Sequence, residues 1–339
     1  MQGVPPPIVP YGCRWTDWWP RAARRPVCST GSSKASVAGL DCTVFIAASS
    51  QEGALTSRPI ELTPRTPNGS MTAFNRRSST MNLGIRGRKA IVCASSQGLG
   101  KGCARALAEE GVSLVINGRN RELLDATAAE IREACGVEVT PVVADLGTPA
   151  GVAALLKACP EPDILVNNNG GPPFRDFREL DRSAMLTGIT MNMLTPIELI
   201  QKTIDGMAAR GFGRIVNITS SSVKMPLAGL DLSSGARAGL TAFVAGIARS
   251  VADKNVTINN LLPGSFDTAR LRGGLSRHAK RSGESVEALA ASAAAAIPAK
   301  RFGTATEFGQ VCAFLCSVPA AYMTGQNILL DGGDFPGAF

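Results

Sequence analysis

The chain of 339 residues is 45% hydrophobic and 18% charged, a composition typical of a soluble globular protein with a sizeable core. Most of its formal net charge of +8 lies at the front, because residues 1–80 hold nine Lys/Arg against four Asp/Glu. The remaining +3 on residues 81–339 gives no case for nucleic acid or a membrane as a partner. No stretch of the sequence is long and apolar enough to span a bilayer.

Residues 1–80 show no sustained helical or strand period, and they contain nine of the 21 prolines. Ordering such a segment costs conformational entropy with little apolar burial in return, so we expect an unstructured extension. A natural start at Met81 or Met71 is the preferred interpretation of this extension. A transit peptide is the alternative, because the segment is rich in Arg and Ser and poor in acids.

From residue 81 onward, short apolar runs alternate with segments of helical periodicity, which is the pattern of βαβ units. The predicted strands are residues 89–94, 112–116, 139–143, 164–166, 214–218, 257–262 and 327–330. The predicted helices are residues 101–107, 121–135, 149–158, 183–210, 233–252, 285–296 and 306–315. We expect one α/β domain over residues 81–339, a Rossmann-type doubly wound parallel sheet. Residues 265–297 read as a polar, mobile segment around the alanine-rich helix and, with residues 171–174, as the lid and rim of a site.

None of the nine cysteines forms a CxxC pair, and most of the last six fall within apolar runs. They are typical of small core residues in a reducing cytoplasm rather than disulfides or metal ligands. The one histidine, His278, lies in a polar segment and is expected to be a solvated loop residue. We therefore expect no metal site.

The first predicted strand ends in Ser95-Ser96-Gln97-Gly98-Leu99-Gly100, a glycine turn before a helix. Such a turn lets a phosphate approach the backbone N–H groups of the helix, although a tight connection without a ligand has the same pattern. Ligands of open parallel sheets bind at the carboxyl ends of the strands. Small or polar residues follow six strands in turn, and they favour a nucleotide there: Ser95 and Ser96, Arg119, Asp145, the run from Asn167 to Gly171, Ser220, and Pro263 with Gly264.

From Met81 onward the sequence resembles the short-chain dehydrogenase/reductase superfamily, and most closely its 3-oxoacyl-carrier-protein-reductase-like members. Several motifs in the family's order carry the resemblance: residues 93–100 for TGxxxGIG, Asp145-Leu146, residues 167–170 for NNAG, Asn192, residues 216–220 around the family's serine, residues 259–268 for N…PGxxxT, Thr324-Gly325-Gln326, and Asp331-Gly332-Gly333. Together these motifs are specific, whereas each alone is weak.

The resemblance implies a dinucleotide at residues Ala94, Ser96, Gln97, Gly98, Leu99, Gly100, Arg119, Asp145, Leu146, Asn167, Asn169, Gly170, Pro263, Gly264 and Thr268. Gly118-Arg119 stands where an acid would bind the ribose 2′-hydroxyl of NAD, so a cation is available for a 2′-phosphate. We therefore expect NADP(H) rather than NAD(H). Ala94 replaces the family's first glycine, which we expect to be tolerable only if its φ is negative.

The family's catalytic Tyr and Lys are absent. Counting from the family's serine, Ser220, Ser233 stands at the position of the Tyr and Arg237 at that of the Lys, and the only Tyr after Met81 is Tyr322. The expected catalytic set is Ser220, Ser233, Arg237 and Asn192. A serine hydroxyl is a far weaker acid than a tyrosine phenol, so a water held by this set, or Lys224 or Asp231, would have to supply the proton.

Two functions stay open at this stage. One is an NADP(H)-dependent oxidoreductase that acts on a carbonyl or alcohol, such as a 3-oxoacyl thioester or another ketone. The other is a homologue with impaired catalysis that binds the nucleotide and acts as a sensor or oligomer partner. By analogy with the family we expect a homotetramer or homodimer in the cytoplasm.

Overall fold

The computed structural model describes residues 81–172 and 174–338. The expectations about residues 1–80, namely the unstructured extension, the start at Met71 and the transit peptide, lie outside this part of the chain.

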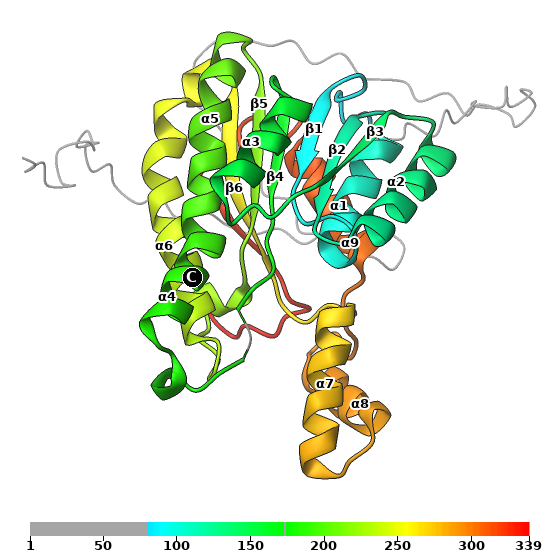
Figure 1. Ribbon diagram of the computed structural model, residues 1–339, viewed down its shortest axis with the longest axis vertical. Coiled ribbons are helices and arrows are strands. Elements are labelled where there is room, and N and C mark those ends of the chain that lie inside the picture. Colours follow the sequence, from blue (N-terminus) through cyan, green and yellow to red (C-terminus); the bar gives the residue numbers. More distant parts are fainter. Residues whose placement is uncertain (1–80, 173, 339) are drawn as a thin grey trace, which may run out of the picture. The chain divides into compact units, whose positions relative to one another are not determined.

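Seven parallel strands form one sheet in the order β3-β2-β1-β4-β5-β6-β7, the strand order of a dinucleotide-binding doubly wound fold (Figure 1). They are β1 Lys89–Val92, β2 Ser113–Gly118, β3 Val139–Val143, β4 Ile164–Asn167, β5 Gly213–Ile218, β6 Val256–Pro263 and β7 Asn327–Leu330. All seven predicted strands are present, with ends that differ by up to two residues. The predicted Rossmann-type parallel sheet is confirmed.

Nine α-helices connect the strands or follow them within the described residues: α1 Gly98–Glu109, α2 Arg121–Cys135, α3 Pro149–Ala158, α4 Arg182–Ile189, α5 Thr195–Ala209, α6 Asp231–Ile247, α7 Ala269–Ser282, α8 Val286–Ala296 and α9 Ala305–Leu315. Helices α1, α2 and α9 cover one face of the sheet, and α3, α5 and α6 cover the other (Figure 1).

Strand β1 shows how the two cores are built. Ala90 and Val92 pack toward α1, α2 and α9, whereas Ile91 and Cys93 pack toward the opposite helices. Successive side chains of a strand point to opposite faces, so a strand that is covered on both faces needs an unbroken apolar run. The later cysteines belong to these cores as free thiols, as the sequence predicted: five of the six are buried, and Cys135 is half-buried.

The predicted helix over residues 183–210 is interrupted. A π-helical turn, Thr190–Leu194, separates α4 from α5, and it contains Asn192. Such turns are frequent at functional sites, because the extra residue changes the direction of the side chains around it. Helix α6 also begins two residues earlier than predicted and ends at Ile247, after which two short 3₁₀ turns lead to β6.

The prediction that the polar segment after β6 has no helix before residue 285 is wrong for residues 269–282. They form α7, which begins at Thr268 as its N-cap and ends at Gly283 with φ +80°. No residue of α7 is buried and only Ala290 of α8 is, so an apolar pattern could not reveal the first of these helices. The two helices pack against each other and project beyond the end of the sheet (Figure 1). Among the helices described, none combines the length and hydropathy needed to cross a bilayer.

Candidate active site

A cavity of about 1020 Å³ opens at the carboxyl ends of the strands. Its wall includes most of the predicted site residues: Ala94, Ser96, Gln97, Gly98, Leu99, Arg119, Asp145, Leu146, Asn169, Gly170, Ser220, Ser233, Arg237, Pro263, Gly264 and Thr268. Gly100, Asn167 and Asn192 do not line it. The fold therefore brings seven separate segments of the chain to one site.

Ala94 adopts a left-handed backbone conformation with φ +44°, so the expectation of a negative φ is wrong. Neighbours hold the residue in place: the Asn117 Oδ1 accepts from its N–H at 3.4 Å, and the Asn168 Nδ2 donates to its carbonyl at 3.1 Å. The same carbonyl explains Gly100, because a Cβ there would overlap the Ala94 oxygen. Gly100 thus permits the close turn rather than facing the cavity.

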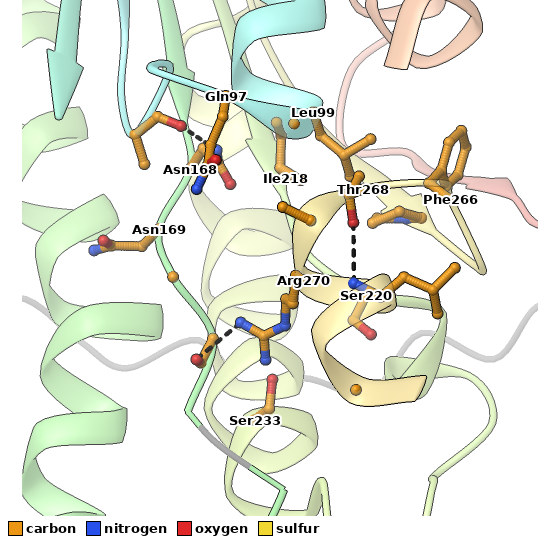
Figure 2. Close-up of a pocket in the computed structure, with 18 of the residues that line it drawn as sticks. Gln97, Leu99, Asn168, Asn169, Ile218, Ser220, Ser233, Phe266, Thr268 and Arg270 are labelled. Carbon is orange, nitrogen blue, oxygen red and sulfur yellow. Dashed lines mark hydrogen bonds between the residues drawn. The ribbon is translucent and has the colours of Figure 1, made fainter. Parts of the chain in front are cut away.

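The first turn of α1 is open to a ligand. Its N-cap residue, Gln97, makes no side-chain cap, whereas α2, α3, α7, α8 and α9 are each capped by a side chain. Uncapped N–H groups at a helix N-terminus bind anions such as a pyrophosphate. Thr268 lies beside this turn, since its Cγ2 is 3.7 Å from the position of a Cβ on Gly98 (Figure 2). The glycine turn and the Pro263–Thr268 loop therefore share one part of the cavity.

Arg119 and Ser96 stand together at the end of β2. A Cβ on Gly118 would lie 3.1 Å from the Ser96 Oγ, which places the serine against the backbone that carries Arg119. Asp145 follows the neighbouring strand, and its carboxylate accepts from the Gly147 N–H at 2.9 Å. A guanidinium and a hydroxyl with no acid between them fit the 2′-phosphate of NADP(H).

Asn167 belongs to the sheet rather than to the cavity wall. Its Nδ2 donates to Asn217 at 2.9 Å, Asn217 donates to Asn260 at 3.0 Å, and Asn260 donates to Asn327 at 2.8 Å. This ladder of amides crosses β4, β5, β6 and β7, from the last residue of β4 to the first residue of β7. It helps to hold these four strands in register.

Next to the main cavity lies a second, small one of about 10 Å³, about the size of one water molecule. Its lining includes Asn167, Asn192 and Arg237. Asn192 donates from Nδ2 to the Gly188 carbonyl at 3.1 Å, but its Oδ1, like that of Asn167, has no hydrogen-bond partner among the described residues. The π-helical turn thus places a buried acceptor without a partner at a small cavity that Arg237 also lines.

Ser233 and Arg237 are in contact, one turn apart on α6. The Arg237 Nε donates to the Ser233 Oγ at 3.2 Å, and its Nη1 donates to the carbonyl of Ile218, the last residue of β5, at 2.6 Å. Both side chains are buried. Ser220, two residues beyond Ile218, accepts from the Ser222 N–H at 3.1 Å and lines the same cavity.

Burial, and then repulsion from Arg270, lowers the pKa of Arg237 to about 10. The guanidinium therefore stays charged at neutral pH. It can orient neighbours and stabilise negative charge, but it cannot take up and release a proton there as a lysine can.

The structure does not bring the other two candidate donors into the cavity. Asp231 accepts from the Gly229 N–H at 3.2 Å at the start of α6, and Lys224 lies over the ring of Phe335. Neither lines the main cavity. A water in the serine-lined cavity is the candidate that remains of those considered.

Sequence reasoning missed Arg270. The residue sits in the first turn of α7, lines the cavity, and donates to the carbonyls of Gly171 and Pro172 at 2.9 and 3.0 Å (Figure 2). Its helix also carries Arg277, His278 and Arg281 on the cavity side, so His278 is a helical residue and not part of a loop. The spacing of 270, 274, 277, 278 and 281 follows a helical face, and it was the available signal in a segment with few apolar residues.

A family model described as enoyl-(acyl carrier protein) reductase matches residues 93–334, more than half of the chain. The chain belongs to the short-chain dehydrogenase/reductase superfamily. Two curated members show the extent of the similarity. The NADPH-dependent reductase BacG of Bacillus subtilis (strain 168) is 33% identical over 251 residues, 73% of this chain and 97% of BacG. The 3-oxoacyl-acyl-carrier-protein reductase FabG of Pseudomonas aeruginosa is 30% identical over 255 residues, 74% of this chain and 98% of FabG.

The fold of this superfamily member also matches solved structures. L-Sorbose reductase from Gluconobacter frateurii, in complex with NADPH and L-sorbose, has a TM-score of 0.73 at 29% identity. The match covers 76% of this chain and 100% of the sorbose reductase. The family expected from the motifs is confirmed, and the cofactor named for this structure and for BacG agrees with the one expected from Arg119.

Proposed function

We propose that the protein is an NADP(H)-dependent oxidoreductase that interconverts a small carbonyl compound and its alcohol. The observation that carries the proposal is a single cavity that joins an uncapped helix N-terminus and Arg119 at one end to Ser220 and the Ser233–Arg237 pair at the other. A chain with only a structural role has little reason to keep both ends. The three relatives described above support the same reaction class.

The chain's own residues fit NADP(H). Gly98 and the first turn of α1 would hold the pyrophosphate, Ser96 and Arg119 the 2′-phosphate, and Asp145 the adenosine end. Arg237 would donate to ribose hydroxyls, and Thr268 would lie near the carboxamide. When bound, the cofactor supplies or accepts the hydride.

The source of the proton is the atypical part of the mechanism. Ser233 is a weaker acid than a phenol, and Arg237 keeps its charge, so neither relays a proton at neutral pH. We infer that Ser220 and Ser233 orient the carbonyl oxygen and a water, while the charge of Arg237 stabilises the alkoxide. A general acid contributes roughly 10²–10⁴-fold in rate, so we expect turnover slower than that of Tyr-containing relatives by a factor within this range.

One observation favours a second function. Both the Tyr and the Lys of the family are replaced, and the replacements form a buried pair of their own. A protein that binds NADPH and reports its level, or that assembles with another subunit, would retain the cofactor end of the cavity and lose the residue that donates the proton. This second candidate predicts tight NADPH binding without turnover.

Restoring the family's pair separates the two. NADPH absorbance is followed against a panel of ketones, sugars and 3-oxoacyl thioesters for the wild type, Ser220→Ala and the double variant Ser233→Tyr/Arg237→Lys. We expect slow turnover in the wild type, loss in Ser220→Ala, and a gain of roughly 10²–10⁴-fold in the double variant. Tight NADPH binding with no turnover in either the wild type or the double variant would establish the second function.

We further propose a dimer or tetramer, located in the cytoplasm. Exposed apolar side chains gather on α4, the π-helical turn and α6: Met185, Leu186, Ile189, Leu194 and Phe243. A second copy of this chain would remove them from water. The cytoplasmic location rests on the six free thiols of the described domain. Light scattering of the purified protein tests the assembly, and a monodisperse monomer would contradict it.

A further inference from the structure

Two arginines face the reacting end of the cavity without a carboxylate. Arg237 hydrogen-bonds only to neutral oxygens, those of Ile218, Ser233 and Asn169. Arg270 hydrogen-bonds only to the carbonyls of Gly171 and Pro172, and it lines the same cavity as Ser233 (Figure 2). The two charges are close enough that Arg270 contributes to the lowered pKa of Arg237. Within residues 81–172 and 174–338, neither forms a salt bridge.

Two other arginines of this half of the chain do form ion pairs. Arg272, on the same helix as Arg270 but off the cavity wall, forms a two-pronged ion pair with Asp267, with both N–O distances at 2.7 Å. Arg301 pairs with Glu307 in the same manner. The acids on the cavity wall are Asp145, at the adenosine end, and Asp334. Neither of these two acids forms a salt bridge with Arg237 or Arg270, so both cations keep their charge uncompensated.

Holding an uncompensated cation next to a buried one costs free energy, because the two like charges repel each other. A ligand carboxylate offsets this repulsion when it binds a guanidinium through two parallel hydrogen bonds. Arg277 and Arg281 extend the positive charge along α7, about 10 and 16 Å from Arg270 at 1.5 Å per residue. Both side chains line the cavity, and their charge attracts an anion toward it.

We propose that the substrate is an oxo acid whose carboxylate lies within a few bonds of the reacting carbonyl and binds Arg270. The proposal rests on the proposed function and names its substrate class. Ser233 in place of the larger tyrosine leaves room for such a group beside the carbonyl. The positive charge of Arg237, one helical turn from Ser233, also favours the carboxylate. The hydroxyls of Ser220 and Ser233 bind the carbonyl oxygen.

The experiment compares acids with their own neutral esters. Pyruvate, acetoacetate and levulinate place the carboxylate at increasing distance from the ketone, and each is assayed against its methyl ester with NADPH. We expect at least one acid to exceed its ester in kcat/KM by roughly 10- to 100-fold, the usual value of a charge-assisted pair. Arg270→Gln should erase this ratio, because it should raise KM for the acid by a much larger factor than KM for the ester.

The matched control is Arg272→Gln, on the same helix and outside the cavity wall, which should keep the ratio. NADPH affinity is measured for both variants. If Arg270→Gln weakens the binding of NADPH as much as the binding of the acid, Arg270 binds the cofactor's pyrophosphate and the proposal is wrong. Equal kcat/KM for acids and esters, or a preference for acetoacetyl-CoA that Arg270→Gln does not change, would also overturn it.

Failure of the proposed function gives a different result. If nothing turns over, calorimetric titration of the protein–NADPH complex with each acid and ester still measures the carboxylate site. Binding of an acid that depends on Arg270 supports the site without the reaction. Absence of acid binding in the wild type overturns the site.

Discussion

At the scale of single residues, Ala94 holds a conformation that its side chain disfavours. A left-handed φ costs an L-residue about 1–2 kcal/mol, and the contacts with Asn117 and Asn168 hold the residue there. The sequence motif revealed that a glycine was missing at this position. It could not reveal the sign of φ, because that depends on partners 23 and 74 residues away.

Ala94→Gly should stabilise the protein. Relief of the strained φ outweighs the added freedom of the unfolded chain, and we expect the free energy of unfolding to rise by about 0.5–1 kcal/mol in urea titrations. Ala104→Gly, inside α1, is the control and should lower it by about 1 kcal/mol. Destabilisation of equal size in both variants would show that Ala94 is not strained.

Arg119→Asp should reverse the cofactor preference. A carboxylate there repels the 2′-phosphate and accepts from a 2′-hydroxyl, so we expect the Kd for NADPH to rise at least tenfold and that for NADH to fall. Arg121→Gln, two residues away and off the cavity wall, is the control and should leave both unchanged. An unaltered NADPH affinity in Arg119→Asp would show that Arg119 does not bind the 2′-phosphate.

At the scale of elements, α1 and α9 are packed backbone to backbone. A Cβ at Gly309 would overlap the Gly102 carbonyl, and one at Gly102 would overlap the carbonyl of Ala305. The glycine turn is the start of α1, so this contact fixes the direction in which its N–H groups point. The sequence showed two glycines in amphipathic helices, and only the tertiary structure shows that they meet.

Gly309→Ala should therefore destabilise the domain by about 3 kcal/mol, since the obstructing atoms belong to the backbone. Gly246→Ala in α6 is the matched control. A Cβ there meets nothing within 4 Å, and the higher helix propensity of alanine should add about 1 kcal/mol. Thermal unfolding measures both, and equal melting temperatures would contradict the close contact.

The start of α9 should respond to pH. Thr304 and Glu307 form a reciprocal cap, and the ion pair with Arg301 and the Thr304 N–H lower the pKa of Glu307 from 4.5 to about 2. A lowered carboxyl pKa stabilises the fold above the unfolded value of 4.5, and this stability is lost as the pH falls toward 2.

Glu307→Gln should remove this part of the pH dependence. Because the pair is exposed and screened, we expect it to contribute less than about 1 kcal/mol. Urea titrations at about pH 5 and pH 3 should show that the difference in the free energy of unfolding between wild type and variant is smaller at the lower pH. A constant gap would mean that the ion pair does not stabilise the helix.

At the scale of the whole molecule, the doubly wound parallel sheet followed from the sequence, and most residues of the predicted site line one cavity. Apolar runs define strands that are buried on both faces, and the polar residues after each run mark one edge of the sheet. The family motifs placed the glycine turn, Ser220 and the Ser233–Arg237 pair. The structure adds the contact between the last two.

Other features depend on tertiary contacts that no local pattern encodes. The π-helical turn at Asn192 needs the packing of α4 and α6, and Asn167 is drawn into a ladder with three other strands. Helix α7 buries no residue, so its polar sequence resembled a loop. Arg270 was missed for the same reason, although its helical spacing to Arg277 and Arg281 was visible.

Hydride transfer is the central claim, and isotope transfer tests it most directly. NADPH deuterated at C4 is incubated with the protein and each ketone or oxo acid, and the alcohol product is analysed by mass spectrometry. The account predicts deuterium on the carbinol carbon of at least one product, absent with Ser220→Ala. Tight NADPH binding without deuterium in any product, from the wild type and from Ser233→Tyr/Arg237→Lys alike, would contradict it.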